Sequence, residues 1–456
     1  MPTLGTDDQL PADLADLAAL RVPRYTSYPT APHFHAPFSP ATHRQWLADV
    51  PATAAISLYL HIPFCQDLCW YCGCSTQAGV QPAPIAAYAE DLLAEIDLVA
   101  AALGRRQPVA RVHWGGGTPL SLAPGDLRRI NRRLRDRFDV APTAEIAIEV
   151  DPRRITAHHL VALADCGVNR VSLGVQDLDP EVQRRIGREQ PFEVVAAAVA
   201  GLRMVAINRI GFDLIYGLPG QTTDTVARTA RDAVRLAPDR LAIFGYAHVP
   251  WARPNQRLID ANLLPDPALR WQLARVAERT IRAAGYQAVG LDHFARADDG
   301  LAIAAAAGQL RRGFQGFTDD PAEIVVGLGA SSISTLPDGY AQNAPQVPAW
   351  RAAIRAGEVP TARGRAMSDD DRLRRRIVET LLCNGSVDVA QIAAPEDLAT
   401  LNEAFTQIDQ LVERGVAVRD GYRVALAPGR QLLARVVAAA FDAYLTPHGP
   451  GHAGAV

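Results

Sequence analysis

The most informative stretch of the chain is Ile56-Ser-Leu-Tyr-Leu-His-Ile-Pro-Phe-Cys65-Gln-Asp-Leu-Cys69-Trp-Tyr-Cys72-Gly-Cys74, an apolar run that leads into four closely spaced cysteines. The apolar part, 56–62, has the length and composition of a buried strand. A helical pattern follows at Ile85–Leu103. The cysteines therefore occupy a loop between a predicted strand and a predicted helix.

Three of these cysteines, Cys65, Cys69 and Cys72, have the spacing of an iron–sulfur ligand set. Thiolates that converge from one loop can hold three corners of a cubane, and the fourth iron is then free to bind a small molecule. Electron-transfer ferredoxins, in contrast, normally fill all four positions with cysteine. We therefore predict a [4Fe–4S] cluster held by Cys65, Cys69 and Cys72, with Cys74 as an additional thiol.

Two other interpretations of the cysteines remain open. All four could hold a structural zinc ion, although zinc ribbons usually draw two ligands from each of two separated knuckles. The cysteines could also form a disulfide-exchange motif. The other two of the six cysteines, Cys166 and Cys383, stand alone. Without a secretion signal, this distribution indicates a metal or redox site instead of a disulfide framework.

A unit of apolar run, turn and amphipathic stretch recurs from residue 55 onward. The apolar runs are Ile56–Ile62, Val109–Trp114, Glu145–Val150, Val168–Val175, Ile210–Ile215 and Leu241–Tyr246. The helical patterns are Ile85–Leu103, Asp126–Phe138, Ala157–Cys166, Val194–Val205, Thr225–Leu236 and Ala268–Ala284. This alternation predicts βα units and a parallel sheet. Because polar residues follow the runs, as they do at the active ends of βα barrels, we predict an α/β fold with a partial TIM-type (βα)6 barrel.

Changes in composition divide the chain into four parts. They are an irregular, proline-rich N-terminal arm over 1–54, the barrel over 55–350, a small, mostly helical α+β domain over 365–446, and a disordered tail over 447–456. In the α+β domain, Ser368 and Asp371 form a capping-box pattern, and Asp420-Gly421 indicates a hairpin turn. Further helices are expected at 395–414 and 431–445. We expect this domain to be a lid or packing module instead of a nucleic-acid contact.

The charged residues narrow the classes of function. All 46 residues in the lysine-plus-arginine count are arginine, so mechanisms that need a lysine amine are excluded. The formal net charge is −3 and the arginines are scattered, which argues against a nucleic-acid binder. No apolar run reaches the ~18 residues of a membrane span, and the start lacks a signal-peptide pattern. We therefore expect a cytoplasmic protein.

A second motif, Val112-His-Trp-Gly-Gly-Gly-Thr-Pro119, follows the second apolar run. Three glycines let a ligand lie against backbone N–H and C=O groups. Beside the cysteine loop, this motif suits the amino and carboxylate groups of S-adenosylmethionine (SAM). The strand ends also carry polar side chains that suit ribose hydroxyls, an ammonium group or a carboxylate. These are Glu149, Gln176, Arg188 and Asp213.

At these residues the chain resembles the oxygen-independent coproporphyrinogen III oxidases, a radical SAM family of haem biosynthesis. The resemblance extends from about Arg21 to the last helix. The matching segments are Arg24–Thr30, Tyr59–Cys65, Cys72–Cys74, His113–Pro119, Glu149–Pro152, Gly174–Asp177, Asp213–Pro219, Asp292–Arg296 and Tyr340–Asn343. So many matches in order are more specific than the cysteine loop, which alone indicates only radical SAM chemistry.

The resemblance implies a [4Fe–4S] cluster and two SAM molecules in one site, with Cys65, Cys69 and Cys72 as the cluster ligands. The SAM on the cluster would contact Tyr59, Gly116, Glu149 and Ile333. The second SAM would contact Tyr71, Gly117, Thr118, Gln176, Arg188, Asp213 and Ala247. We expect Tyr59, Glu149 and Cys74 to be the catalytic residues.

The resemblance also implies a reaction and partners. A 5′-deoxyadenosyl radical would start the oxidative decarboxylation of two propionate side chains of coproporphyrinogen III to vinyl groups, giving protoporphyrinogen IX. The expected partners are this substrate and an electron donor such as flavodoxin or ferredoxin, and we expect a monomer. By charge alone, Arg24, Arg188 and Arg296 are candidate partners of the substrate carboxylates.

Two segments depart from the family pattern. The stretch Phe314-Gln-Gly-Phe-Thr-Asp319 stands where Tyr-Gln-Gly-Tyr or Phe-Thr-Thr is usual, so Phe314 and Phe317 bear on the substrate pocket. Ser75 follows Cys74 where Asn is common. The alternative function is that of a related haem chaperone without oxidase activity. Its loop usually reads Cys-Asp-Phe after the third ligand and its arm lacks Arg-Tyr-Thr-Ser-Tyr-Pro, so Cys72-Gly-Cys74 and Arg24–Pro29 favour the oxidase.

Overall fold

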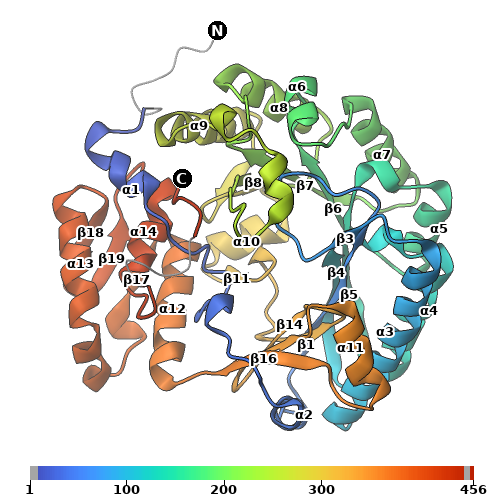
Figure 1. Ribbon diagram of the computed structural model, residues 1–456. Coiled ribbons are helices and arrows are strands. Elements are labelled where there is room, and N and C mark those ends of the chain that lie inside the picture. Colours follow the sequence, from blue (N-terminus) through green and yellow to red (C-terminus); the bar gives the residue numbers. More distant parts are fainter. Residues whose placement is uncertain (1–8, 446–451) are drawn as a thin grey trace.

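The computed structural model describes residues 9–445 and 452–456, and its centre is a curved sheet of 12 strands (Figure 1). The middle of the sheet is parallel. In spatial order its strands are β13 (Ile324–Leu328), β1 (Ile56–Ile62), β4 (Pro108–Gly116), β5 (Asp139–Val150), β6 (Arg170–Gln176), β7 (Arg209–Tyr216) and β8 (Arg240–Gly245). All six predicted runs are therefore strands of a partial barrel, which confirms the predicted fold class.

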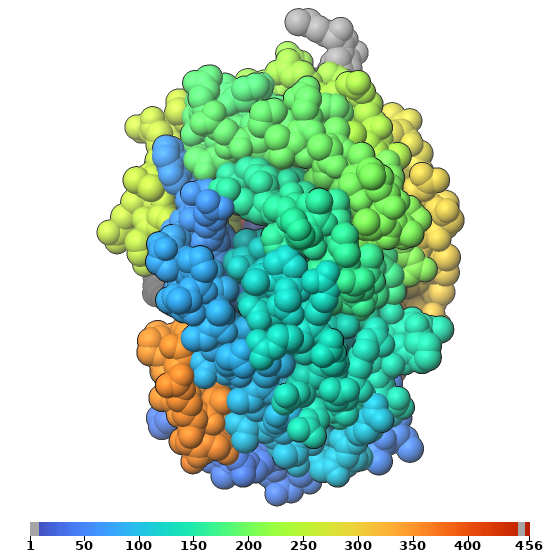
Figure 2. Space-filling view, turned by 90° about the vertical axis from the view of Figure 1, so that its right-hand side faces the viewer, coloured from blue at the N-terminus to red at the C-terminus, as the bar shows by residue number. Residues whose placement is uncertain are grey.

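Helices cover the outer face of this sheet (Figure 1), and over one side of the molecule Figure 2 shows the colours passing from blue through teal to green, in chain order. They are α3 (Pro82–Leu103), α4 (Pro124–Arg137), α5 (Ala157–Asp165), α6 (Pro180–Arg185), α7 (Phe192–Met204), α8 (Thr223–Arg235) and α9 (Pro267–Ala283). Local signals set their ends. The Thr156 side chain accepts a hydrogen bond from His159 N at the start of α5, and Gly167 follows its end with a φ of 72°.

Alternation along the strands separates an apolar outer face from a polar interior. In β1, Leu58 and Leu60 are at most 1% exposed and belong to the core between sheet and helices. Ser57, Tyr59 and His61 alternate with them. The interior of the barrel thus carries side chains that can bind ligands, while the helices supply the hydrophobic stability.

The amino ends of the strands are closed by an ion network. We call it the amino-end network and define it by Arg111, Glu145, Arg170, Arg240, Asp299 and Asp319. Arg111 and Arg240 contact Asp319 at 3.0 and 2.9 Å, and Arg170 contacts Glu145 at 2.8 Å. Arg240 also contacts Asp299 at 2.6 Å. These side chains neutralise one another and plug the barrel.

Antiparallel strands extend the sheet at both edges, and the sequence did not predict them. They are β14 (Ile333–Leu336), β15 (Gly339–Asn343) and β16 (Thr361–Ala366) at one edge, and β10 (His293–Ala295) and β9 (Gln287–Val289) at the other. β13, the seventh parallel strand, was also missed. Helix α11 (Val347–Arg355) lies between β15 and β16 in the chain. These strands have six residues or fewer, too short for a clear periodic signal.

The N-terminal arm is more regular than expected. It contains α1 (Ala15–Ala19) and α2 (Pro40–Ala48), and Ser39 caps α2 by accepting a hydrogen bond from Thr42 N. Between these helices the arm runs from α1, beside the C-terminal module, across the open side of the barrel to α2 (Figure 1). Tyr25 and Tyr28 are buried there, at 4% and 2% exposure. The prolines therefore shape the connection without excluding helices.

The C-terminal module contains helices and a small sheet. Its elements are α12 (Asp369–Asn384), β17 (Ser386–Asp388), α13 (Asn402–Glu413), β18 (Ala417–Asp420), β19 (Arg423–Leu426) and α14 (Ala434–Ala439). The capping box of Ser368 and Asp371 and the hairpin at Asp420-Gly421 are confirmed. The helix expected at 395–414 begins as a 3-10 segment, Pro395–Leu401, before α13. The helix expected at 431–445 is shorter, because α14 ends at Ala439.

The chain end is described only in part. The disordered tail predicted for 447–456 falls partly outside the described residues, since 446–451 are not described. Residues 452–456 instead pack against the molecule. Gly454 forms a β-bridge with Arg21, and Val456 is 2% exposed. Among the helices of the described residues, none has the length and apolarity needed to cross a membrane.

Candidate active site

The cysteine loop leaves the carboxyl end of β1 and is held by one amide side chain. Asn255 Nδ2 lies 3.2 Å from Cys69 O, 3.1 Å from Trp70 O and 3.0 Å from Cys72 O. Its neighbour Gln256 donates to Tyr71 O at 2.9 Å. The loop is therefore held by a segment that follows β8 and lies more than 180 residues later in the chain.

Donors surround the cysteine sulfurs. Arg188 Nη1 lies 3.4 Å from Cys69 Sγ, Arg153 Nη2 lies 3.8 Å from the same atom, and Thr76 Oγ1 lies 3.3 Å from Cys65 Sγ. Asp151 pairs with both arginines. Burial acts to raise the pKa of Asp151, but the hydrogen bond from Arg153 and the charge of Arg188 hold it below its usual value. Positive charge thus stands beside Cys69.

The three predicted ligands fit an iron–sulfur cluster. Cys65, Cys69 and Cys72 are free thiols on one loop, and N–H and O–H donors point at all three of their sulfurs. Such donors and positive charges stabilise anionic thiolates and tune cluster potentials. Within residues 9–445 and 452–456, no three His, Cys, Asp or Glu side chains converge as a single metal ion requires. A cubane takes its ligands at separate corners.

The three glycines after β4 make room for the protein's own groups. A Cβ on Gly115 would lie 2.7 Å from Glu149 Oε1, and a Cβ on Gly117 would lie 2.6 Å from Phe64 O. Gly116 has a φ of 114°, which favours glycine. These glycines let the cysteine loop and Glu149 approach the end of β4 closely. The expectation that a ligand lies on this backbone stays a prediction.

A cavity of about 700 Å³ opens beside the cysteine loop. The four residues expected to contact the SAM on the cluster all line it, together with the predicted catalytic Cys74; they are Tyr59, Gly116, Glu149 and Ile333. Within it, Tyr59 Oη lies 3.0 Å from His61 Nδ1, and His61 Nε2 lies 2.8 Å from Ser75 O. Glu149 lies 3.0 Å from His113 Nε2. Hydrogen bonds thus fix the orientation of these side chains.

Part of the set expected for a second SAM gathers at the end of β6. A Cβ on Gly174 would lie 2.7 Å from Gln176 Nε2 and 3.3 Å from Arg188 Nη2, so both side chains lie over this glycine. The strand register pairs Gly174 with Asp213. Gln176 has a φ of 65°, which is unusual for a residue with a side chain and recurs at ligand sites.

The remaining members of this set lie near the cysteine loop. Tyr71 belongs to it, Thr118 N donates to Phe64 O at 2.8 Å, and Ala247 follows β8. The buried atoms Thr118 Oγ1 and Arg188 Nε have no hydrogen-bond partner within the part of the chain that the structure describes. Buried polar atoms are rarely left without a partner, so these two are available to a ligand.

Asp213 has a raised pKa. Burial raises the pKa of its carboxyl to about 6, and the hydrogen bond from Ser172, at 2.9 Å, opposes that rise only in part. Asp213 lines a cavity of about 130 Å³ inside the barrel, below the cysteine loop. A hydroxyl or ammonium group of a ligand would stabilise its ionised form.

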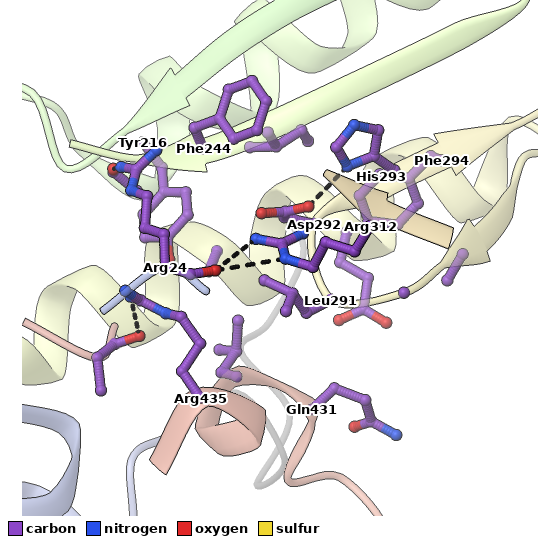
Figure 3. Close-up of a pocket in the computed structure, with 18 residues that line it drawn as sticks. Arg24, Tyr216, Phe244, Leu291, Asp292, His293, Phe294, Arg312, Gln431 and Arg435 are labelled. Carbon is purple, nitrogen blue, oxygen red and sulfur yellow. Dashed lines mark hydrogen bonds and ion pairs between the residues drawn. The ribbon is translucent and has the colours of Figure 1, made fainter. Parts of the chain in front are cut away.

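The arginines expected to meet substrate carboxylates occupy other places. Arg24 donates to Gly245 O at 2.6 Å in a smaller pocket of about 70 Å³, where Arg312 also donates to the Arg24 carbonyl and His293 holds Asp292 (Figure 3). Arg188 is buried beside Cys69. Arg296 is exposed and pairs with Asp298. The arginines that line the 700 Å³ cavity are instead Arg253, Arg311, Arg312, Arg363 and Arg375.

The two phenylalanines that depart from the family pattern have different surroundings. Phe314 lines the large cavity and lies 6.0 Å from Tyr340, edge to face. Phe317 is 5% exposed inside the barrel, where its ring lies 5.3 Å from that of His293 and 4.4 Å from the Arg312 guanidinium. Only Phe314 is therefore placed to touch a ligand in the large cavity.

Sequence reasoning missed several residues of the site. Arg153, Asn255 and Gln256 contact the cysteine loop but belong to no motif, and the cavity arginines come from segments far apart in the chain. Only Arg153 had a local signal, because it follows Asp151 in a segment already singled out after a strand.

Comparisons with known proteins agree with this geometry. Residues 59–233 match the model of the radical SAM superfamily. The chain is 48% identical over 449 residues to an oxygen-independent coproporphyrinogen III oxidase of Bradyrhizobium diazoefficiens, covering 97% of this chain and 100% of that protein. It is 45% identical to its namesake in Paracoccus denitrificans, covering 93% and 94%. The solved coproporphyrinogen III oxidase of Escherichia coli, described as a radical SAM enzyme, superposes with a TM-score of 0.87 at 35% identity, covering 93% of this chain and 100% of that one.

Proposed function

The chain belongs to the oxygen-independent coproporphyrinogen III oxidases, a radical SAM family, and we propose that it decarboxylates two propionate side chains of coproporphyrinogen III to vinyl groups, giving protoporphyrinogen IX. One observation carries the proposal. The cavity of about 700 Å³ joins the cysteine loop to a wall with five arginines. A tetracarboxylate substrate needs positive charge next to a radical-generating centre, and the cavity brings the two together.

Family membership implies a [4Fe–4S] cluster and SAM, and the residues fit both groups. We assign the cluster to Cys65, Cys69 and Cys72, whose sulfurs lie among Arg153, Arg188 and Thr76. When bound, the two cofactors supply a one-electron route to hydrogen abstraction from carbon. The protein positions the substrate, shields the site from water and tunes the charge around the cofactors.

The first SAM site uses the side chains around the cysteine loop. Glu149, fixed by His113, presents a carboxylate to a ligand amine, and Gly116 presents backbone groups. Tyr59, fixed by His61, offers a flat apolar face with a hydroxyl at its edge. Cys74 is the one cysteine of the loop outside the ligand set, and its backbone N lies 3.4 Å from Cys72 Sγ.

Polar groups that the first SAM molecule would not contact support a site for a second one. Gln176, Arg188 and Asp213 gather around Gly174, and the buried atoms Thr118 Oγ1 and Arg188 Nε need partners. Tyr71, Gly117 and Ala247 complete this proposed site. Equilibrium dialysis should give two SAM molecules for each cluster. A ratio of one would contradict the second site.

The haem chaperone is the less favoured function. The relatives that match nearly the full chain carry the oxidase name, and the loop reads Cys72-Gly-Cys74. We further propose that the protein acts as a cytoplasmic monomer and receives electrons from a flavodoxin or ferredoxin.

Anaerobic turnover tests the function directly. Reconstituted protein with SAM, a chemical reductant and coproporphyrinogen III should form protoporphyrinogen IX and release two CO2 for each substrate molecule. The matched control omits SAM. Protein with a complete cluster that binds haem but forms no vinyl product would contradict the oxidase and favour the chaperone.

A further inference from the structure

The five arginines of the large cavity fall into two groups. Three of them are engaged by the protein. Arg311 pairs with Glu323 at 3.3 Å, Arg312 donates to Arg24 O at 2.8 Å, and Arg363 donates to Phe34 O at 2.9 Å. Each of the three therefore helps to hold a loop or the N-terminal arm in place, although Arg312 Nη1 is buried without a partner among the described residues.

Arg253 and Arg375 are different. In the described part of the chain, neither guanidinium donates a hydrogen bond or forms an ion pair, although both are half-buried in the cavity wall. Arg375 lies 5.8 Å from the centre of the Tyr340 ring, a stacking contact that leaves its N–H groups unused. The chain has 49 acidic residues, so the lack of a carboxylate beside these two arginines is local and not a general shortage.

Because both unpaired guanidinium groups border the cavity, an anion that enters it can complete these two positions. The planar guanidinium matches a carboxylate with two parallel hydrogen bonds. Both side chains border the same cavity as the cysteine loop. Any carboxylate that they bind therefore belongs to a molecule within reach of that loop.

The two arginines belong to different walls. Arg253 precedes Asn255, whose side chain donates to Cys72 O at 3.0 Å and so holds the cysteine loop. Arg375 lies on α12 of the C-terminal module, over Tyr340, which also contacts Phe314. One guanidinium thus stands near the predicted cluster ligands, and the other on the wall formed by α12 and β15.

We propose that Arg253 and Arg375 bind two carboxylates of one tetrapyrrole substrate from different walls of the cavity. Arg253 positions a propionate beside the cysteine loop, where it reacts, and Arg375 anchors a propionate that is kept. This assignment rests on the proposed function, because that function supplies a substrate with several carboxylates. It also gives the C-terminal module a role in substrate binding.

The carboxylate beside Arg253 has two possible sources, a substrate propionate or the methionyl group of SAM. Separate binding measurements distinguish them. The probes are coproporphyrinogen III and SAM, each added alone to anaerobic, cluster-containing protein without reductant. The test variants are Arg253→Gln and Arg375→Gln. The controls are Arg257→Gln and Arg376→Gln, since these neighbouring arginines are exposed and do not line the cavity.

Arg375→Gln should weaken coproporphyrinogen III binding about tenfold or more and leave SAM binding unchanged, because a charge-assisted pair is lost. In turnover, its KM should rise while kcat stays near that of the wild type. Arg253→Gln should weaken substrate binding and also lower kcat. Both controls should match the wild type. Arg375→Lys should recover part of the affinity for coproporphyrinogen III, since the lysine ammonium keeps the positive charge but cannot form the two parallel hydrogen bonds of a guanidinium.

Two results would overturn the proposal. One is an Arg375→Gln protein that binds the substrate as tightly as Arg376→Gln. The other is an Arg253→Gln protein that loses SAM affinity but keeps substrate affinity, which would assign Arg253 to the cofactor. Failure of the proposed function is a separate outcome, because a wild-type protein that binds coproporphyrinogen III without converting it still permits the binding comparison.

Discussion

The two ends of the barrel treat charge in opposite ways. At the amino end, the amino-end network pairs arginines with carboxylates at 2.6 to 3.5 Å, and the contacts of Arg240 are 2.6 and 2.9 Å. At the carboxyl end, Arg253 and Arg375 have no such partner among the described residues, and Arg188 Nε is buried without one. Polar groups that stabilise a fold are satisfied within it. Those left open at one end mark where ligands bind.

Two aspartates express the same contrast in their pKa values. Burial acts to raise the pKa of Asp319, but Arg240 and Arg111 hold it at about 2. Burial raises the pKa of Asp213 to about 6, since among the described residues only Ser172 donates a hydrogen bond to it and no arginine pairs with it. The ionised carboxylate is thus stabilised at Asp319 in the amino-end network and destabilised at Asp213 in the candidate active site.

The largest expected effect comes from removing one of the predicted cluster ligands at the carboxyl end of the barrel. Cys65→Ser should abolish cluster binding and turnover, because one corner of the cubane loses its thiolate. Iron and acid-labile sulfide analysis of anaerobically purified protein measures this. The matched control is Cys74→Ser, which should keep full iron content. Equal iron and turnover in Cys65→Ser and the wild type would contradict the ligand assignment.

Breaking the amino-end network should lower the stability of the fold instead. Asp319→Asn leaves Arg111 and Arg240 without their shared carboxylate and should lower the free energy of unfolding by about 3 kcal/mol. In the wild type, the contribution of Asp319 is present above its unfolded pKa near 4 and is lost as the pH falls from there toward 2. Denaturant unfolding at pH 7 measures the loss, and an unchanged midpoint would show that the network is not stabilising.

Replacing Asp213 should change the free energy of unfolding by less than Asp319→Asn does, and in the opposite direction. Because its pKa is raised, the wild type loses stability as the pH rises from about 4 to about 6. Asp213→Asn lacks that loss and should be about 2 kcal/mol more stable at pH 7.5 than the wild type. It should also bind SAM more weakly. The check is denaturant unfolding at pH 5 and 7.5, and a variant less stable at both values would contradict the raised pKa of Asp213.

Much of the barrel could be predicted from the sequence because its signals are local. The predicted strand Ile56–Ile62 has the observed bounds, and the capping box at Ser368 begins the observed helix. Each signal depends on the period of a single element or on residues a few positions apart. The strands β13 to β16 were missed because they are short and are stabilised by pairing with other strands.

The site divides in the same way. The cysteine spacing was visible because all three predicted ligands share one loop. The arginine wall was not, since Arg253 and Arg375 are joined only by the fold, and nothing in their local sequence separates them from the other arginines of a chain without lysine. Charge alone favoured Arg24 and Arg296, which the structure places against Gly245 O and Asp298.

Electron paramagnetic resonance of the reduced, anaerobically reconstituted protein is the most direct test of a cluster in which one iron has no cysteine ligand. SAM should change the spectrum of a four-iron cluster, because a set of three thiolates leaves one iron free to bind a small molecule. A protein without a cluster, or a cluster whose spectrum is the same with and without saturating SAM, would contradict the assignment of Cys65, Cys69 and Cys72 as a three-thiolate set.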